Sequence, residues 1–227
     1  MWTLAVEEQF YLMWPFIILF LPRRWLLSGI VTIAFSGMLF RLIFLSLGMG
    51  HFSASMLTPS HLDTLGIGGV LAILFPLKEQ KPLLFKRILL LTFLIGISIL
   101  FIVFVAKIMG LPSTVEFVLG EVGSGLFFMW VIGNAALGFN GFFGQILSHS
   151  SLTFLGKISY GMYVYHWFVP NITKHTLAKL DILLPQSEWL LCVLFSAISI
   201  SAAAFSWHFM EAPILKLKNH FSYRPLS

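Results

Sequence analysis

Two adjacent carboxylates, Glu7 and Glu8, stand at the start of a long apolar segment. An ionised carboxylate at the centre of a bilayer costs about 2.5–3.5 kcal/mol, so charges placed here need a physical reason. On a helix, residues spaced by three or four share a face. One such face would carry a hydroxyl, a carboxylate, a phenol and an indole, from Thr3, Glu7, Tyr11 and Trp14. The alternative is that the carboxylates only complement the positive end of the helix dipole.

The composition is that of a membrane protein. Of the 227 residues, 58% are hydrophobic and 10% are charged, and the mean hydropathy is +0.92. The apolar segments are nearly continuous and about twenty residues long, which a helix needs to cross ~30 Å of hydrocarbon. Strands of a membrane β-barrel would instead alternate over roughly ten residues. The sequence therefore predicts an all-α, polytopic transmembrane helix bundle.

Seven segments are candidates for membrane-spanning helices. No linker is long enough to divide them, so we expect residues 1–215 to form one membrane domain and residues 216–227 a cytoplasmic tail. The third segment is short and rich in glycine, which predicts close helix packing or a bend. The seven segments cover about 5–21, 26–47, 61–76, 88–108, 116–137, 151–170 and 188–210.

Basic residues predict the orientation of these helices, because cytoplasmic loops are enriched in Lys and Arg. They follow the first, third and seventh segments, whereas the loop 48–60 has none. Lys174 and Lys179, in the expected loop between the last two segments, argue the opposite way. We expect an extracytoplasmic N-terminus and a cytoplasmic C-terminus. The residues that support this are Arg23, Arg24, Lys78, Lys81, Lys86, Arg87, Lys216, Lys218 and Arg224.

The ionisable residues inside the apolar segments fall in the outer half of the membrane in this orientation. Such residues usually face the bundle interior and pair with one another. We therefore expect Arg41 to pair with Glu7 or with Asp63 in an extracytoplasmic cavity. Glu121 and His166 lie at similar depth. No Cys/His cluster has metal-ligand spacing and no basic run is long, so we expect neither a metal site nor nucleic-acid binding.

Residues 2–11, W-T-L-A-V-E-E-Q-F-Y, resemble the W-S-L-x-x-E-x-x-F-Y signature of the acyltransferase-3 family of membrane O-acyltransferases. Glu7, Phe10 and Tyr11 match, and Thr3 keeps the hydroxyl of the usual serine. A second stretch, T-P-S-H-L-D-T-L-G-I-G-G, resembles the family's Arg-x-Asp and glycine-rich helix at residues 58–69. Asp63 and Gly68 match there. His61 replaces the arginine, so a permanent cation becomes one whose charge depends on pH near neutrality.

Two further motifs lie near the C-terminus. Residues 155–169, L-G-K-I-S-Y-G-M-Y-V-Y-H-W-F-V, are similar to the family's Gly-x-Ile-Ser-Tyr-x-Leu-Tyr-x-x-His. Their spacing predicts that Ser159, Tyr163 and His166 share one helix face. Residues 205–213 resemble the closing Tyr-Arg-x-x-Glu-x-Pro through Glu211 and Pro213, and we expect Pro213 to end the last helix. A stripe of small residues upstream predicts close helix packing. It comprises Ser196, Ser199, Ala203 and Ser206.

The resemblance implies transfer of an acyl group, commonly acetyl, from acyl-CoA to a hydroxyl of an extracytoplasmic carbohydrate or lipid-linked glycan, in a bacterial inner membrane. The candidate catalytic residues are Glu7 and His166. The family's core has ten helices, so we expect this chain to be inactive unless a separately encoded N-terminal part supplies the missing ones. The candidate substrate-binding residues are Thr3, Tyr11, Arg41, His61, Asp63, Ser159 and Tyr163. The candidate structural-motif residues are Phe10, Gly68, Glu211 and Pro213.

Two other functions are compatible with seven membrane helices. One is a membrane receptor or sensor, although a retinal protein would need a lysine in its last span, and residues 189–210 contain none. The other is a proton-coupled transporter, which would place ionisable residues near the middle of the membrane. In this sequence they gather instead near the predicted outer surface.

Overall fold

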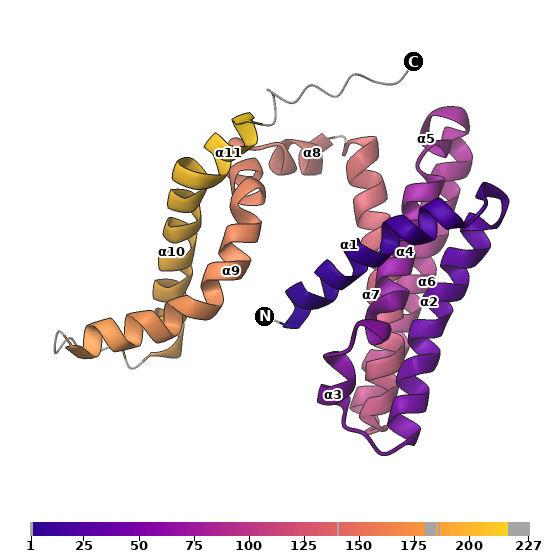
Figure 1. Cartoon of the computed structure of the whole chain (residues 1–227), viewed down its shortest axis with the longest axis horizontal. Coiled ribbons are helices and arrows are strands. Elements are labelled where there is room, and N and C mark those ends of the chain that lie inside the picture. The colour runs from indigo at the N-terminus through magenta and orange to yellow at the C-terminus, as the bar shows by residue number, and fades with distance from the viewer. Residues whose placement is uncertain (1, 140, 180–184, 186, 218–227) are drawn as a thin grey trace. The chain divides into compact units, whose positions relative to one another are not determined.

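A computed structural model describes residues 2–139, 141–179, 185 and 187–217 (Figure 1). The described residues are helical or lie in short turns, with no strand among them, which confirms the predicted all-α class. The chain divides into two compact units, residues 1–139 and residues 140–227. Each unit is described by itself below. That residues 1–215 form one membrane domain remains a prediction.

The first unit contains seven helices and a 3-10 turn within the described residues. Helices α1, α2, α4 and α6 correspond to the first four predicted spans, and α7 corresponds to the fifth. The elements are α1 (Trp2–Phe20), α2 (Arg23–Ser46), α3 (His51–Ser55), the 3-10 turn η1 (Thr58–His61), α4 (Leu62–Leu74), α5 (Leu77–Gln80), α6 (Pro82–Ile108) and α7 (Ser113–Leu137).

The second unit is built on two long helices, α9 and α10. Its elements are α8 (Gly141–Leu147), α9 (Ser150–Lys179), α10 (Glu188–Ser206), a π-helical turn η2 (Trp207–Glu211) and α11 (Ala212–Leu217). Lys174 and Lys179, which the sequence placed in a loop, lie in the last turns of α9. The helix continues through Pro170, and Figure 1 shows α9 bending in its second half, as a proline inside a helix favours.

Four helical segments in the described part of the chain are long and apolar enough to cross a membrane. They are α2, α6, α7 and the continuous stretch Glu188–Leu217. The other three predicted spans correspond to α1, α4 and α9, so each predicted segment forms a helix. The 13 residues of α4 extend only about 20 Å, less than the ~30 Å hydrocarbon core. The count of seven crossings remains a prediction.

The helices of the first unit pack closely because glycine stands where two backbones meet. A Cβ on Gly37 of α2 would lie 2.7 Å from the backbone nitrogen of Asp63, at the start of α4. A Cβ on Gly96 of α6 would lie 2.9 Å from the backbone nitrogen of Phe127 in α7. A side chain at either position would separate the pair of helices. Apolar side chains fill the space beside these crossings, with a core of Leu71, Phe85, Leu89 and Met129.

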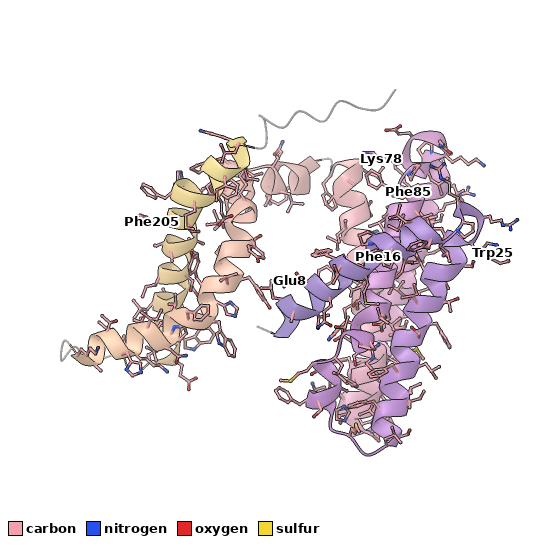
Figure 2. All side chains as sticks on the ribbon, viewed as in Figure 1. Glu8, Phe16, Trp25, Lys78, Phe85 and Phe205 are labelled. Carbon is pink, nitrogen blue, oxygen red and sulfur yellow. The ribbon has the colours of Figure 1, made fainter. Side chains whose placement is uncertain are left out.

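Basic residues gather at one end of the first unit, where the α1–α2 turn and α5 lie; we call this the basic end (Figure 1). Lys78, labelled with Trp25 in Figure 2, donates from Nζ to the carbonyl oxygen of Ala136 at 2.6 Å. At the opposite end, near α3, Lys107 is paired with Glu116 at 3.0 Å. The basic end comprises Arg23, Arg24, Lys78, Lys81, Lys86 and Arg87.

The small-residue stripe packs α10 against α9, as its composition predicts. Ser199, Ala203 and Ser206 are buried. A Cβ on Gly161 of α9 would lie 3.2 Å from the Cβ of Ala203, which is tighter than an ordinary contact. The second unit therefore depends on small side chains on both helices.

The expectation that Pro213 ends the last helix is wrong. The chain passes through the π-helical turn and continues as α11 to Leu217. The Ala212 amide donates to the carbonyl oxygen of Trp207, five residues earlier, so the hydrogen-bond register shifts before the proline. Pro213 then occupies the first turn of α11, where its missing N–H has no required partner.

Gly37→Ala should destabilise the protein by about 1–3 kcal/mol, because the added Cβ meets backbone that cannot move independently. The matched control is Gly120→Ala in α7, where an added Cβ meets nothing within 4 Å. Alanine there should leave stability unchanged or raise it by up to about 1 kcal/mol. Thermal unfolding in detergent measures both. Equal stability of the two variants would contradict the close α2–α4 approach.

Candidate functional site

A buried ion pair joins α2 to the start of α4. Nη2 of Arg41 donates to Oδ2 of Asp63, and the two residues are 0% and 2% exposed. The sequence left open whether Arg41 would pair with Glu7 or with Asp63; the pairing with Asp63 is confirmed. A buried charge is tolerated only where it is paired and hydrogen-bonded. The position of α4 against α2 is therefore tied to this contact.

The Arg41 guanidinium makes further contacts that bring two other elements to the same point. Nη1 donates to the carbonyl oxygen of Ser60 in η1 at 3.1 Å, and Nη2 donates to that of Val118 in α7 at 3.2 Å. The ring of Phe117 lies 5.7 Å from the guanidinium carbon. Nε has no hydrogen-bond partner among the described residues. With no exposed surface, the arrangement favours a helix-joining role for Arg41 and Asp63 over the substrate contact expected from the sequence.

His61 lies beside this ion pair, at the end of η1. Its Nε2 donates to the carbonyl oxygen of Ser55 at 2.8 Å, and its side chain is half-buried. The Thr64 hydroxyl donates in turn to the carbonyl oxygen of His61 at 2.9 Å. His61 thus fastens η1 to α3.

The candidate site residues of α1 take no part in the Arg41–Asp63 ion pair. Glu7 and Tyr11 are exposed within the first unit. The ring of Phe10 lies tilted against that of Trp14, with the centroids 4.6 Å apart, and Trp14 occupies the space beside Gly69 of α4. Of the expected face, Trp14 packs inward while Glu7 and Tyr11 remain accessible. The Thr3 side chain lies outside the described part of the structure.

Glu8 is exposed as well, near the start of α1 (Figure 2). Exposure therefore does not distinguish Glu8 from Glu7. The distinction between the two carboxylates rests on their helix faces, because Glu7 is four residues from Tyr11 and seven from Trp14, whereas Glu8 is six residues from Trp14.

The predicted face of α9 lines a cavity in the second unit. Ser159, Tyr163 and His166 border a space of about 600 Å³ between α9 and α10, which confirms that they share a face. Nδ1 of His166 is hydrogen-bonded to the carbonyl oxygen of Tyr163. A carbonyl can only accept, so Nδ1 is the donor, and Nε2 carries the lone pair whenever the ring is neutral. The α10 wall of the cavity comprises Cys192, Phe195, Ser196, Ser199 and Ile200.

Cys192 and Ser196 are cavity residues that the sequence did not identify as part of a site. Their spacing of four on an apolar helix is the only sequence signal, and it resembles ordinary packing. Across the part of the chain that the structure describes, no group of three or more His, Cys, Asp or Glu side chains could hold a metal ion.

The last motif holds α10 against α9. The Ser206 hydroxyl donates to Oε1 of Glu211 at 3.3 Å across the π-helical turn, and the same oxygen lies 3.6 Å from the position of a Cβ on Gly161. His208 is hydrogen-bonded from Nδ1 to the carbonyl oxygen of Ala204 at 2.9 Å. These contacts fit the structural role expected for Glu211.

Another groove lies in the first unit, between α4 and α7, with a volume of about 370 Å³. Gly68 lines it, and a Cβ added there would meet nothing within 4 Å. The motif glycine therefore borders open space, whereas Gly66 packs with its Cβ position 2.7 Å from the Cβ of Ala34. The sequence could not foresee this groove, because its two walls are far apart in the chain.

Asp63→Asn should cost about 3–5 kcal/mol of stability, because it leaves the Arg41 charge buried without a counter-charge. The matched control is Glu116→Gln, which breaks an exposed ion pair whose side chains are 67% and 50% exposed. That change should cost about 0–1 kcal/mol. Chemical denaturation in detergent compares the two. A loss for Asp63→Asn no larger than that for the control would show that the buried pair does not hold α2, α4 and α7 together.

Comparisons with known proteins agree with the motifs. A family model described as "Acyltransferase domain" matches residues 1–208. The chain is 28% identical to the O-acetyltransferase OatA of Staphylococcus aureus (strain NCTC 8325 / PS 47), over 95% of this chain and 36% of that protein. It is 27% identical to the peptidoglycan O-acetyltransferase OatA of Listeria monocytogenes serovar 1/2a, over 95% of this chain and 35% of that protein.

No solved structure matches this chain. The chain spans about a third of the length of the curated relatives it matches. The family match covers the first three motifs and residues 205–208 of the fourth, but not Glu211 and Pro213, and it extends over most of the 227 residues. On that basis the chain belongs to the acyltransferase-3 family of membrane acyltransferases.

Proposed function

We propose that this chain is part of a membrane O-acyltransferase that moves an acetyl group from acyl-CoA to a hydroxyl of a glycan outside the cell membrane. Family membership and the names of the two relatives support the acetyl group and a cell-envelope glycan. Acyl transfer also explains the four motifs, which neither a sensor nor a proton-coupled transporter requires. The bacterial inner membrane is the proposed location.

The observation that carries this proposal is the cavity between α9 and α10, with Ser159, Tyr163 and His166 on one wall. In the reaction, the C–S bond of the thioester breaks, a C–O bond forms to the acceptor, and the acceptor's proton ends on the CoA thiol. The Nε2 lone pair of His166 can take that proton and later return it. The hydroxyl groups of Ser159 and Tyr163 can orient the acceptor by hydrogen bonds.

The acyl-CoA phosphates need cationic partners. The residues that line the α9–α10 cavity include none with a permanent positive charge. We therefore place only the acceptor and the transferring acetyl group in this cavity. Binding of the phosphorylated part of the donor is assigned to a further segment, such as the N-terminal helices that the family resemblance implies.

Glu7 is the second proposed catalytic residue, because it is an accessible carboxylate on the motif face of α1. Glu7→Gln should lower acetyl transfer on the order of 10²-fold or more, as expected for loss of a group that positions the acceptor or relays its proton. Glu8→Gln, one residue away on another face, is the matched control and should retain most activity. Labelled acetyl incorporated into surface glycan is measured with a relative's N-terminal helices supplied. Equal losses of acetyl transfer in both variants would indicate that the two carboxylates only complement the positive end of the helix dipole.

The proposed orientation places the basic end in the cytoplasm and α3 outside. Reporter fusions at residues 55 and 80 should then read outside and inside, respectively, because the positive charges favour the cytoplasmic side. A fusion after residue 216 should read inside. A cytoplasmic signal at residue 55 would overturn both the orientation and the external acceptor.

A further inference from the structure

We infer that the groove between α4 and α7 binds the hydrocarbon chain of a lipid whose uncharged head carries hydroxyl groups. Figure 1 shows the two helices side by side, and they run in parallel: a Cβ on Gly125 would touch Ile67 and Thr64, while Leu71 and Met129 meet further along. The volume of about 370 Å³ falls in the range of small-molecule sites. This groove shares no lining residue with the α9–α10 cavity of the proposed reaction.

The groove is polar at one end and apolar along the rest. Thr64, Glu121 and Ser124 line the end nearer to α3, and the remaining wall is apolar. From Glu121 to the last lining residue of α7 the helix rises about 16 Å. Phe128 and Ile132, in the apolar part, are 56% and 57% exposed, so the groove is open along its side. The apolar lining comprises Ile67, Leu71, Phe128, Met129 and Ile132.

The polar end offers hydrogen-bond acceptors and no free donor. The Thr64 hydroxyl donates to the carbonyl oxygen of His61, and the Ser124 hydroxyl donates to that of Gly120. Both oxygens therefore present only lone pairs to the groove. The Glu121 carboxylate, which lines the groove, has no hydrogen-bond or ion-pair partner among the described residues, and its oxygens can accept hydrogen bonds. A ligand head that satisfies three separate acceptors must carry several donors.

This pattern selects among the heads of membrane lipids. A phosphate offers acceptors and negative charge, so it would be repelled by Glu121. A single ammonium group would satisfy the carboxylate but is one compact point charge, whereas the three acceptors lie on two helices. A sugar or polyol head provides several O–H donors in different directions. The hydroxylated head therefore fits this end best.

The direction of the groove indicates which leaflet supplies the lipid. Its polar end lies toward α3 and its apolar part runs toward the basic end. In the proposed orientation, a lipid of the outer leaflet enters with its head outward and its chain toward the middle of the membrane. Only this choice of leaflet rests on the proposed function; the binding itself does not.

The test uses the full-length protein in phosphatidylcholine nanodiscs with photoactivatable probes of one chain length. An alkyl glucoside, an alkyl phosphate and an alkylammonium are compared, and the labelled peptides are identified by mass spectrometry. The glucoside should label α4 and α7 on the order of tenfold more than the phosphate, the ratio that about 1.4 kcal/mol of discrimination gives. Glu121→Gln should reduce this preference severalfold.

A blocking variant and its control test the location. Gly68→Leu adds a side chain to the wall of the groove at a position where a Cβ meets nothing within 4 Å, so glucoside labelling should fall on the order of tenfold. Gly120→Leu also enters open space but does not line the groove, and its labelling should match that of the parent protein. Thermal unfolding of both variants confirms that they remain folded.

A second pair keeps the test decisive if Gly68→Leu fails to fold. Ile132→Asn places a polar group in the apolar part of the groove and should lower labelling severalfold. Ile102→Asn changes a residue of α6 that is similarly exposed, at 54%, and should have no effect.

Three results would overturn the inference: equal labelling by glucoside and phosphate, labelling that both blocking variants leave unchanged, or preferential labelling by the alkylammonium. Acetyl transfer is measured separately. If labelling loses its specificity while acetyl transfer is intact, only the inference of lipid binding is refuted. If labelling is specific but acetyl transfer is absent, only the proposed function is refuted.

Discussion

The Arg41 charge has to be neutralised inside the first unit, and much of that unit follows from this constraint. The guanidinium is completely buried, so its free energy depends on a carboxylate and carbonyl oxygens held at fixed positions. Asp63 can reach it only if the start of α4 lies directly against α2. Gly37, one turn before Arg41 on the same face, provides the room, because a Cβ there would meet the Asp63 backbone at 2.7 Å. One face of α2 thus supplies both the charge and the space.

The same constraint positions the α4–α7 groove. Thr64 directly follows Asp63, and Glu121 lies one turn after Val118, whose carbonyl oxygen accepts from Arg41. The polar end of the groove is therefore anchored by the residues that satisfy the buried charge. Beyond this point the helices are held by the apolar core around Phe85, labelled in Figure 2, and the groove becomes apolar. A rigid polar end followed by an open apolar wall suits an amphipathic ligand.

The second unit uses a different kind of packing. Its two long helices approach through small residues, Gly161 on α9 and Ala203 on α10, and not through an ion pair. Close approach at this point leaves a wider space further along the same helices, where the larger side chains of the α9 motif stand. The hydrogen bond from Nδ1 of His166 to its own helix fixes the ring tautomer without help from a neighbouring helix. The proposed base is therefore prepared by local structure.

The sequence by itself determined the helices, the apolar environment and the family. These depend on composition and on residue spacing along one helix, which is why the shared face of Ser159, Tyr163 and His166 was predicted correctly. Spacing shows which face a side chain occupies but not which helix lies opposite. The partner of Arg41 therefore remained open until the tertiary structure placed Asp63, and not Glu7, beside it.

Other features were decided by tertiary structure alone. The helix continued past Pro213 because a π-helical turn shifted the hydrogen-bond register, which no sequence rule for proline includes. The groove lined by Gly68 and Glu121 arose because α4 and α7, separated by the whole of α6, lie in parallel against the same buried charge. Contacts between segments distant in the chain depend on how helices pack in three dimensions, and periodicity within a single helix carries no information about that packing.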